Sequence, residues 1–161
     1  MSKRKTLPLA TTLMVRDHCL CLHIQRAARA VARRFDTALR PLRLTSGQFS
    51  LLMSLNRSVP PTLGMVSSVL AMDRTTLTAN LKPLQRRGLL RVSVDQADKR
   101  TRRAALTATG HALLIAAMPV WQKTNADVEK FLGRSRADEL RAELRRLSQA
   151  DEAVAASEPR S

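Results

Sequence analysis

Apolar residues recur every three to four positions over most of the chain, which predicts a mainly helical protein. The two longest stretches of this kind cover about 13–39 and 108–132. Thr107 is a suitable N-cap for the second stretch, and Gly133 can end it. A last helix is expected from Ser135 onward. Its apolar stripe contains Leu140, Leu144 and Leu147.

Three shorter helices are predicted in the middle of the chain. Thr45-x-x-Gln48 is a capping box that starts the first. Thr62 can cap the second and Asp73 the third, because each offers a side-chain oxygen to free backbone N–H groups. The short Ala71-Met72 connection between the second and third helices indicates a helix-turn-helix. The apolar stripe of the third helix is Leu77, Leu81 and Leu84.

The opposite face of the third helix carries small hydroxylated or cationic side chains and has no acid after its cap. Such a face suits the major groove of DNA, because hydroxyl and guanidinium groups reach base edges while cations reach phosphates. We therefore predict a DNA-binding surface on this helix. Its residues are Arg74, Thr75, Thr76, Thr78, Asn80, Lys82 and Arg86.

A short β-hairpin is predicted to follow the third helix. Apolar and polar residues alternate along 90–94, and 102–106 returns as a second strand after a polar tip at 95–100. An arginine on such a tip can enter the neighbouring minor groove, whose negative potential attracts it. Arg100 is the candidate, and Asp98 could hold it in an extended pose. The predicted DNA contacts of the hairpin are Asp98, Lys99, Arg100 and Arg102.

The order of these motifs resembles the MarR family of bacterial transcription regulators, over roughly 15–135. The resemblance implies a homodimeric winged helix-turn-helix protein, usually a repressor that is released by a small molecule or by thiol oxidation. The segments that carry it are Asp73–Thr78, Leu84–Leu89, Asp95 to Arg100, and Leu106–Gly110.

The expected organisation has a DNA-binding domain at 45–106 between long helices at 11–44 and 107–150. These helices carry more apolar surface than one small domain can cover, so we expect them to pair two copies of the chain. A two-fold dimer places its two DNA-binding domains about 34 Å apart, which predicts a pseudo-palindromic operator. Residues 1–10 are expected to form a flexible basic arm, and 151–161 a frayed tail.

The composition agrees with a polyanionic partner. The net charge is +15, and the segment 71–105 has nine cations against three acids. Cations gathered around a reading motif favour double-stranded DNA over a membrane as the partner. No apolar run reaches the roughly 20 residues of a membrane span, and no signal peptide is evident. We therefore expect a cytoplasmic protein.

Two cysteines and two histidines lie close together near the N-terminus. Cys19 and Cys21 are too close on one helix to form a disulfide. One straight helix cannot direct both of them together with His18 and His23 at a single tetrahedral ion, so no metal site or other cofactor is expected. The favoured interpretation is two small apolar side chains, and the alternative is a redox-sensing thiol.

A small-molecule pocket is the other way in which activity could be controlled. The family resemblance implies that it lies between the reading head and the dimer helices. His23 or Arg26 could pair with an aromatic carboxylate there, while Met53, Met118 and Trp121 could hold its ring. For each residue taken alone the favoured interpretation is structural: Met53 and Met118 fill the core, and Trp121 lies in the dimer interface.

The sequence does not indicate an enzyme, because it has no glycine-rich phosphate loop and no Ser/His/Asp arrangement. The favoured hypothesis is a sequence-specific repressor that is released by a small aromatic or phenolic acid. The alternatives are a thiol-based repressor that uses Cys19 or Cys21, a non-specific architectural DNA-binding protein, and a dimeric protein-interaction module.

Overall fold

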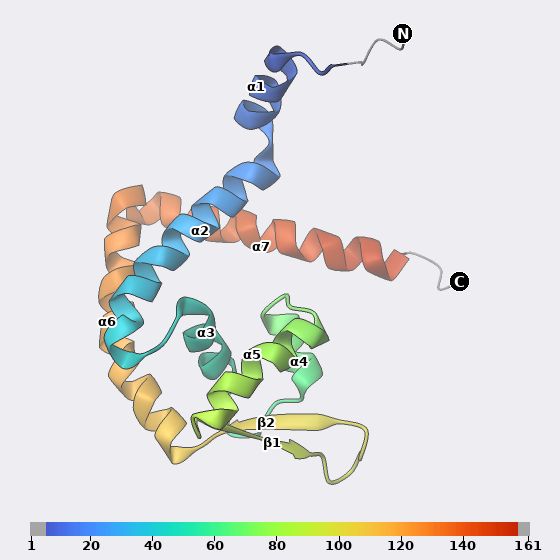
Figure 1. The fold of residues 1–161 in the computed structure, drawn as a ribbon, viewed down its shortest axis with the longest axis vertical. Helices are drawn as coiled ribbons and strands as arrows, with labels where there is room; N and C mark the ends of the chain where they lie inside the picture. Colours follow the sequence, from blue (N-terminus) through green and yellow to red (C-terminus); the bar gives the residue numbers. More distant parts are fainter. Residues whose placement is uncertain (1–5, 158–161) are drawn as a thin grey trace.

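The computed structural model describes the backbone of residues 6–157 and the side chains of residues 6–149. Long helices frame a smaller unit of short helices and one hairpin (Figure 1). The predicted mainly helical class with a single hairpin is confirmed. In chain order the elements are α1 Leu9–His18, α2 Leu20–Leu39, the 3-10 turn η1 Arg40–Leu42, α3 Ser46–Ser54, α4 Leu63–Val69, α5 Arg74–Arg86, β1 Leu90–Val94, β2 Arg102–Leu106, α6 Ala108–Leu132 and α7 Arg134–Ser157.

The predicted N-caps are confirmed by their hydrogen bonds. Thr45 and Gln48 form the reciprocal capping box at the start of α3. Thr62 Oγ1 accepts the Met65 N–H at 3.1 Å, and Thr107 Oγ1 accepts the Gly110 N–H at 3.1 Å. Each bond satisfies a backbone donor that a helix leaves free at its start, which is why these helices begin at these residues.

The turn between α4 and α5 is closed without a glycine. Ala71 has φ of 47°, in the left-handed region that glycine usually occupies. The Met72 N–H donates to the Ser67 carbonyl at 2.9 Å, and the Ser67 hydroxyl donates back to the Met72 carbonyl. These two bonds hold the turn and fix the angle between the two helices.

The hairpin is tied to the loop that precedes α4. Strands β1 and β2 pair antiparallel, with Leu90 opposite Leu106 and Val94 opposite Arg102. The Ala104 N–H donates to the Pro61 carbonyl at 3.1 Å, which adds a short third segment beside β2. The hairpin is therefore a wing anchored to the helix-turn-helix.

A single aliphatic core joins the long helices to the winged unit. Phe49 stacks on Trp121 with ring centroids 6.3 Å apart, and this contact links α3 to α6. The predicted stripe of α5 is fully inside this core. The largest fully buried side chains of the core are Leu39, Leu51, Leu52, Leu77, Leu84, Leu90 and Val66.

The N-terminal helix differs from the prediction of one helix over 13–39. It begins earlier, at Leu9, and is interrupted at Cys19, whose backbone is extended with φ −73° and ψ 103°. Cys19 Sγ accepts the Leu22 N–H at 3.4 Å, so this residue ends α1 and caps α2. Residues 9 and 10 are therefore helical rather than part of a flexible arm, while residues 1–5 lie outside the described part.

The last helix also departs from the expected bounds. It begins at Arg134, immediately after Gly133, whose φ of 84° separates it from α6. It extends to Ser157, so 151–157 is helical where a frayed tail was expected, and 158–161 lies outside the described residues. Within the described range, no helix is long and apolar enough to cross a membrane.

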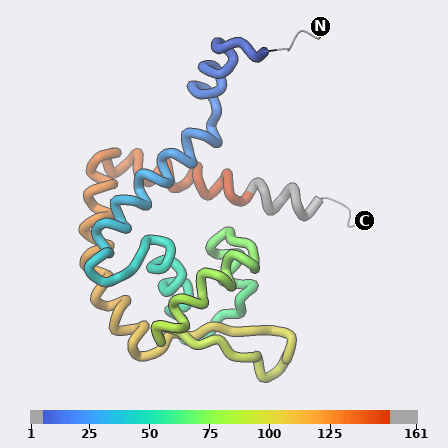
Figure 2. Tube along the Cα trace, viewed as in Figure 1, coloured from blue at the N-terminus to red at the C-terminus, as the bar shows by residue number. Residues whose placement is uncertain are grey.

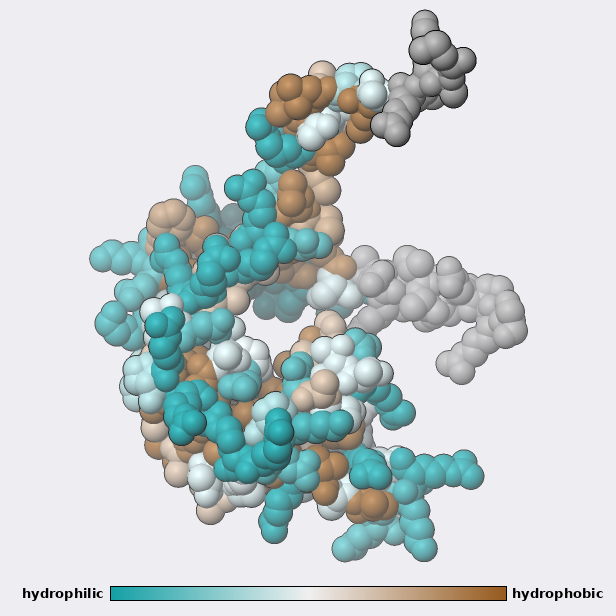
Figure 3. All heavy atoms as spheres, viewed as in Figure 1, coloured by the Kyte–Doolittle hydropathy of each residue, from teal (hydrophilic) through white to brown (hydrophobic). Residues whose placement is uncertain are grey.

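Apolar side chains remain exposed on the long helices of a single chain. The trace in Figure 2 shows α1 leading away from the rest of the molecule, and Figure 3 shows apolar residues gathered on it. The largest exposed side chain of α6 is Phe131, at 81% exposure. Other exposed apolar residues on α1 and α7 are Leu9, Met14, Val15, Leu140, Leu144 and Leu147.

Candidate nucleic-acid interface

Helix α5 presents its polar face to solvent. Asp73 caps the helix by accepting the Thr76 N–H at 2.8 Å, and the three leucines of its stripe are buried. The side chains predicted to read DNA are all exposed: Arg74, Thr75, Thr76, Thr78, Asn80, Lys82 and Arg86. The face that sequence reasoning assigned to DNA is therefore free in this structure.

The hydroxyls of this face are not equivalent. Thr76 Oγ1 donates to Asp73 at 2.6 Å, and Thr78 Oγ1 donates to the Arg74 carbonyl at 2.8 Å. These two oxygens keep only acceptor capacity and their methyl groups for a partner. Thr75 makes no side-chain hydrogen bond within the described residues, so its hydroxyl can both donate and accept. Asn80 turns its amide toward Met72 Sδ, 3.4 Å away.

Two aspartates shape the tip of the wing. Asp95 Oδ1 accepts the N–H groups of Ala97 and Asp98, at 2.9 and 3.0 Å. Asp98 Oδ1 accepts the Arg100 N–H at 2.9 Å, and its Oδ2 accepts the Thr101 hydroxyl at 2.8 Å. Asp98 thus holds Arg100 through the backbone N–H of that residue. Its carboxylate is directed into the hairpin.

All three acids of the 71–105 segment accept hydrogen bonds from neighbouring residues of the chain. The hydrogen bond from the Thr76 hydroxyl lowers the pKa of Asp73, and the Arg103 guanidinium lowers the pKa of Asp95. The Arg100 backbone N–H lowers the pKa of Asp98. These carboxylates stay ionised and accept hydrogen bonds from their neighbours, but nine cations outnumber them in this segment, so the surface of α5 and the wing has a net positive charge.

Two of the nine cations in this segment have structural roles. Arg103 contacts Asp95 through Nε and donates from Nη1 to the Pro60 carbonyl at 2.8 Å. Arg87 donates to the Arg43 carbonyl at 2.7 Å, which joins the end of α5 to the turn before α3. Sequence reasoning counted both as surface charge, because the carbonyl groups that they contact lie 44 and 43 residues away along the chain.

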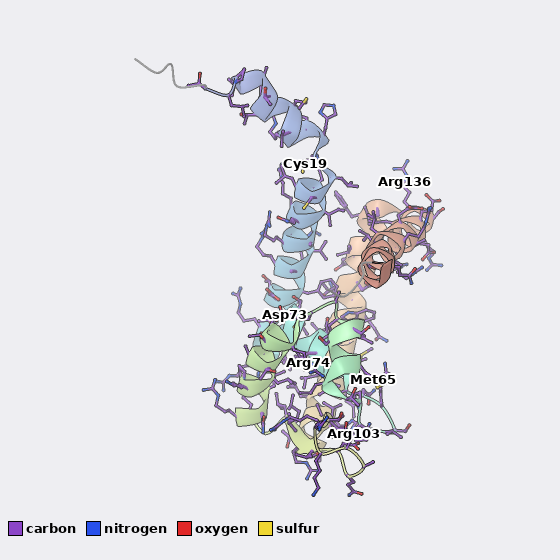
Figure 4. All side chains as sticks on the ribbon, turned by 90° about the vertical axis from the view of Figure 1, so that its right-hand side faces the viewer. Cys19, Met65, Asp73, Arg74, Arg103 and Arg136 are labelled. Atoms are coloured by element: carbon purple, nitrogen blue, oxygen red, sulfur yellow. The ribbon has the colours of Figure 1, made fainter. Side chains whose placement is uncertain are left out.

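A groove of about 300 Å³ lies where α4, α5 and the wing meet. Three arginines line it: Arg74 from α5, and Arg100 and Arg102 from the returning arm of the hairpin. Figure 4 shows Arg74 at the start of α5, with α4 beside it and Arg103 further down at the hairpin. The sequence placed these three side chains on one surface but did not indicate that they share a groove.

The residues predicted to line an effector pocket do not come together in one chain. Met53, Met118 and Trp121 pack against the core where α3 meets α6. His23 and Arg26 are exposed near the other end of α2, and His23 lies about 22 Å along the helix from Ala38 at 1.5 Å per residue. Ala38 and Val120 share the groove between α2 and α6, which has a volume of about 760 Å³.

The cysteine region contains neither a disulfide nor a metal-binding group of side chains within the described residues. Cys21 is exposed, and its Sγ accepts a hydrogen bond from Gln25 at 3.3 Å. The nearby Arg16 pairs with Asp17 at 2.6 Å. Cys19 lies between α1 and α2 (Figure 4), where it serves as a cap.

Comparisons with known proteins agree with this geometry. The model of the MarR family matches residues 44–101. Transcriptional regulator HosA of Escherichia coli O157:H7 is 42% identical over 66 residues, which are 41% of this chain and 47% of HosA. The matched region thus spans about half the length of this curated relative.

Solved structures match over most of the chain. The M. tuberculosis transcriptional regulator MosR in complex with DNA is 39% identical, with a TM-score of 0.77, over 85% of this chain and 98% of MosR. Bordetella bronchiseptica BpsR, whose DNA binding is regulated by 6-hydroxynicotinic acid, is 27% identical, with a TM-score of 0.69, over 78% of this chain and 95% of BpsR. The fold, the family model and these relatives together show that this chain belongs to the MarR family of transcription regulators.

Proposed function

We propose that this protein is a transcription repressor that binds a pseudo-palindromic operator as a homodimer. The observation that carries the proposal is the net positive surface of α5 and the wing, where exposed cations outnumber the three acids and each acid is hydrogen-bonded to its neighbours. A surface of this kind attracts the phosphate backbone by releasing its counterions. The crystallised complex of MosR with DNA supports the same assignment.

Base reading and phosphate binding are assigned to different residues of this surface. Thr75 and Thr78 lie on the exposed face of α5 and would meet base edges in the major groove. Arg100 at the wing would reach the minor groove. Phosphate contacts would come from Lys82, Arg86 and Lys99, which are exposed and lie further along α5 or at the hairpin tip.

Dimerisation is proposed through the long helices, with 45–106 as the DNA-binding domain and 11–44 and 107–150 as the pairing region. Exposed apolar residues on α1, α6 and α7 support this, because burying them in a second copy is favourable. The two α5 helices would then lie about one DNA turn apart, ~34 Å. Because the partner is chromosomal DNA, we place the protein in the cytoplasm and assign it no catalytic role.

Selection of bound duplexes from a random pool tests this function directly. We expect a pseudo-palindromic site to emerge and its binding constant to fall steeply with salt. Equal affinity for random and selected DNA would instead favour an architectural DNA-binding protein. A protein-interaction module would show no salt-dependent DNA binding. Sedimentation of the free and bound protein would give the number of chains on each site.

A small aromatic acid is the proposed effector, and the regulation of BpsR by 6-hydroxynicotinic acid supports this class of ligand. Within one chain the groove between α2 and α6 offers Arg33 and Arg34 beside alanine and valine side chains, while Lys123 at the same groove pairs with Asp127. A carboxylate could pair with these cations while the ring rests on the apolar part. The expected result is release of operator DNA by such an acid, with loss of the effect in Arg34→Ala.

A thiol sensor is the second candidate, and the position of Cys19 favours it. Oxidation of a sulfur that caps α2 would remove the hydrogen bond from the Leu22 N–H at the junction of α1 and α2. Operator binding of the wild type, Cys19→Ser and Cys21→Ser would be compared before and after peroxide. Unchanged binding of the wild type would exclude this candidate.

A further inference from the structure

We propose that the groove between α4, α5 and the wing binds one phosphate of the DNA backbone, and that Arg74 is a phosphate contact rather than a base reader. This inference rests on the proposed DNA-binding function and deepens it. It changes the role of Arg74, which the sequence pattern grouped with Thr75 and Thr78 as a source of sequence choice.

The first support is the charge of the groove. Arg74, Arg100 and Arg102 line it from two different elements, and no carboxylate lies among its lining residues. Within the described part of the chain, none of the three guanidinium groups takes part in an ion pair. Three like charges that share a groove repel one another, and a bound anion would relieve that repulsion. Phosphate is an anion whose geometry the planar arginine fork matches, through paired N–H donors.

The direction of the Arg74 side chain is the second support. Its Nη2 lies 3.9 Å from the position that a Cβ on Gly64 would occupy, so the guanidinium extends to the start of α4. The guanidinium therefore lies at the groove beside α4, and Figure 4 labels Arg74 between α5 and α4. Thr75, the next residue along α5, is not among the groove residues and remains on the outer face.

The hydroxyls of the groove provide one free donor. Thr78 and Thr101 also line the groove, but they donate their protons to the Arg74 carbonyl and to Asp98. Thr62 differs, because its Oγ1 accepts the Met65 N–H and keeps its own proton. This proton can be donated to a phosphate oxygen beside the arginines.

The start of α5 does not offer a competing anion site. Asp73 already occupies the free N–H groups there, and its carboxylate is held ionised by Thr76, which lowers its pKa. An anion at this end would face the charge of Asp73. The arginine groove on the wing side of α5 is therefore the better place for the phosphate.

A phosphate bound in this groove would join the wing to the recognition helix. Arg102 belongs to β2 and Arg74 to α5, so one bound group would fix the angle between the two elements. The major-groove and minor-groove contacts would then be set by the same phosphate, because it lies between the surfaces that make them.

Methylphosphonate substitution in the selected operator tests the assignment. One neutral linkage at a time would replace each phosphate, and binding would be measured for the wild type, Arg74→Ala and Arg102→Ala. Arg91→Ala is the matched control, because Arg91 is exposed on β1 and lies outside the groove. We expect one linkage per half-site whose neutralisation weakens wild-type binding about tenfold, as for a lost charge-assisted hydrogen bond.

The variants decide between a phosphate contact and a base contact. Neutralising the sensitive linkage should weaken binding clearly less in Arg74→Ala and in Arg102→Ala than in the wild type, while Arg91→Ala should remain as sensitive as the wild type. DNA selected by Arg74→Ala should show the wild-type sequence preference, and Arg74→Lys should recover part of the affinity. Circular dichroism would confirm that each variant is folded.

Two results would overturn the inference alone, and a third would also overturn the proposed function. Relaxed preference at one base pair in Arg74→Ala would make Arg74 a base reader. If Arg74→Ala and Arg102→Ala lose as much affinity as the wild type at every neutral linkage, the phosphate is bound elsewhere. In both cases the wild type still binds its operator, so the proposed function stands. Absence of salt-dependent DNA binding by the wild type would overturn the proposed function together with this inference.

Discussion

The carbonyl oxygen of Leu89 packs directly against Gly110, at 2.0 Å from the position that a Cβ there would take. The same carbonyl accepts the Thr107 N–H at 3.1 Å, so the first turn of α6 is locked to the end of the α5–β1 connection. This contact joins α6 to the DNA-binding domain at the residue that precedes β1. Only glycine allows the approach, which gives a physical reason for the Leu-Thr-x-x-Gly pattern at 106–110.

Replacement of Gly110 by alanine is therefore expected to destabilise the protein. Either the backbone of Leu89 or the start of α6 must move, and overpacking of this kind costs about 1–3 kcal/mol. Urea unfolding followed by circular dichroism would measure the change. Gly47→Ala is the control, because a Cβ at Gly47 meets nothing within 4 Å. It should leave stability unchanged or raise it slightly; equal losses in both variants would contradict the role given to Leu89.

Ala71→Gly should have the opposite effect. A left-handed backbone costs an L-residue roughly 1–2 kcal/mol, and part of this strain is released by glycine. The greater freedom of glycine in the unfolded chain offsets some of the gain, so we expect an increase of about 0.5–1 kcal/mol. The midpoint of thermal unfolding would report it. Ala79→Gly, in the exposed interior of α5, should lower stability by about 1 kcal/mol. A loss in Ala71→Gly would show that the turn is not strained.

The sequence could predict the elements whose bounds depend on local residue patterns. Caps, leucine stripes and hairpin bounds depend on neighbours a few residues away, so Asp73, Thr107 and the strands at 90–94 and 102–106 were placed correctly. The interruption at Cys19 has no proline or glycine to announce it, and its cap is a sulfur. Periodicity therefore merged α1 and α2 into one helix.

The sequence predicted which residues form the DNA-binding surface, but not how their side chains are arranged on it. The sequence placed Arg74, Arg100 and Arg102 on a DNA-binding surface, yet their shared groove depends on how β2 packs against the start of α4. Likewise, no local pattern shows that Asp98 bonds the backbone of Arg100. The sequence also did not show which part of α2 packs against the core. His23 was expected beside Met53 and Trp121, but it lies near the other end of that helix.

Acid should weaken the wing through Asp95. Its pKa is lowered by Arg103, so ionised Asp95 stabilises the fold above the ordinary carboxyl pKa of 3.8. That stability is lost as pH falls below 3.8 and through the depressed folded value. We expect Asp95→Asn to unfold at a lower temperature than the wild type at pH 7, with the difference shrinking below about pH 4.

A surface pair provides the comparison for this pH profile. Asp127 pairs with Lys123 at 3.1 Å, but the two side chains are 60% and 80% exposed. Such pairs add little to stability because solvent screens them. Asp127→Asn should therefore melt close to the wild type at pH 7. A difference between wild type and Asp95→Asn that stays constant from pH 7 to pH 3 would mean that the ion pair with Arg103 does not stabilise the wing.

Base reading by Thr75 should be separable from phosphate binding by Lys82. Thr75 has a free hydroxyl on the outer face of α5, so Thr75→Ala is expected to relax preference at one base pair by about 1–3 kcal/mol. Lys82→Ala should weaken binding to every sequence alike and reduce the salt dependence by about one charge. Competition binding with operators altered at single base pairs, over a range of salt, measures both. A uniform loss in Thr75→Ala would count against base contact.

Pairing of two chains should depend on the apolar stripe of α7. Leu144 is 40% exposed in one chain, next to charged neighbours that keep the opposite side of the helix in water. Leu144→Glu would place a carboxylate in the proposed interface, where burying an unpaired charge is costly. We expect sedimentation to show a shift from dimer to monomer at micromolar concentration and operator affinity to fall with it. Arg145→Glu, which changes an exposed charged position on the same helix, should leave the dimer intact. If Leu144→Glu sediments as the wild type does, the pairing surface lies elsewhere on the long helices.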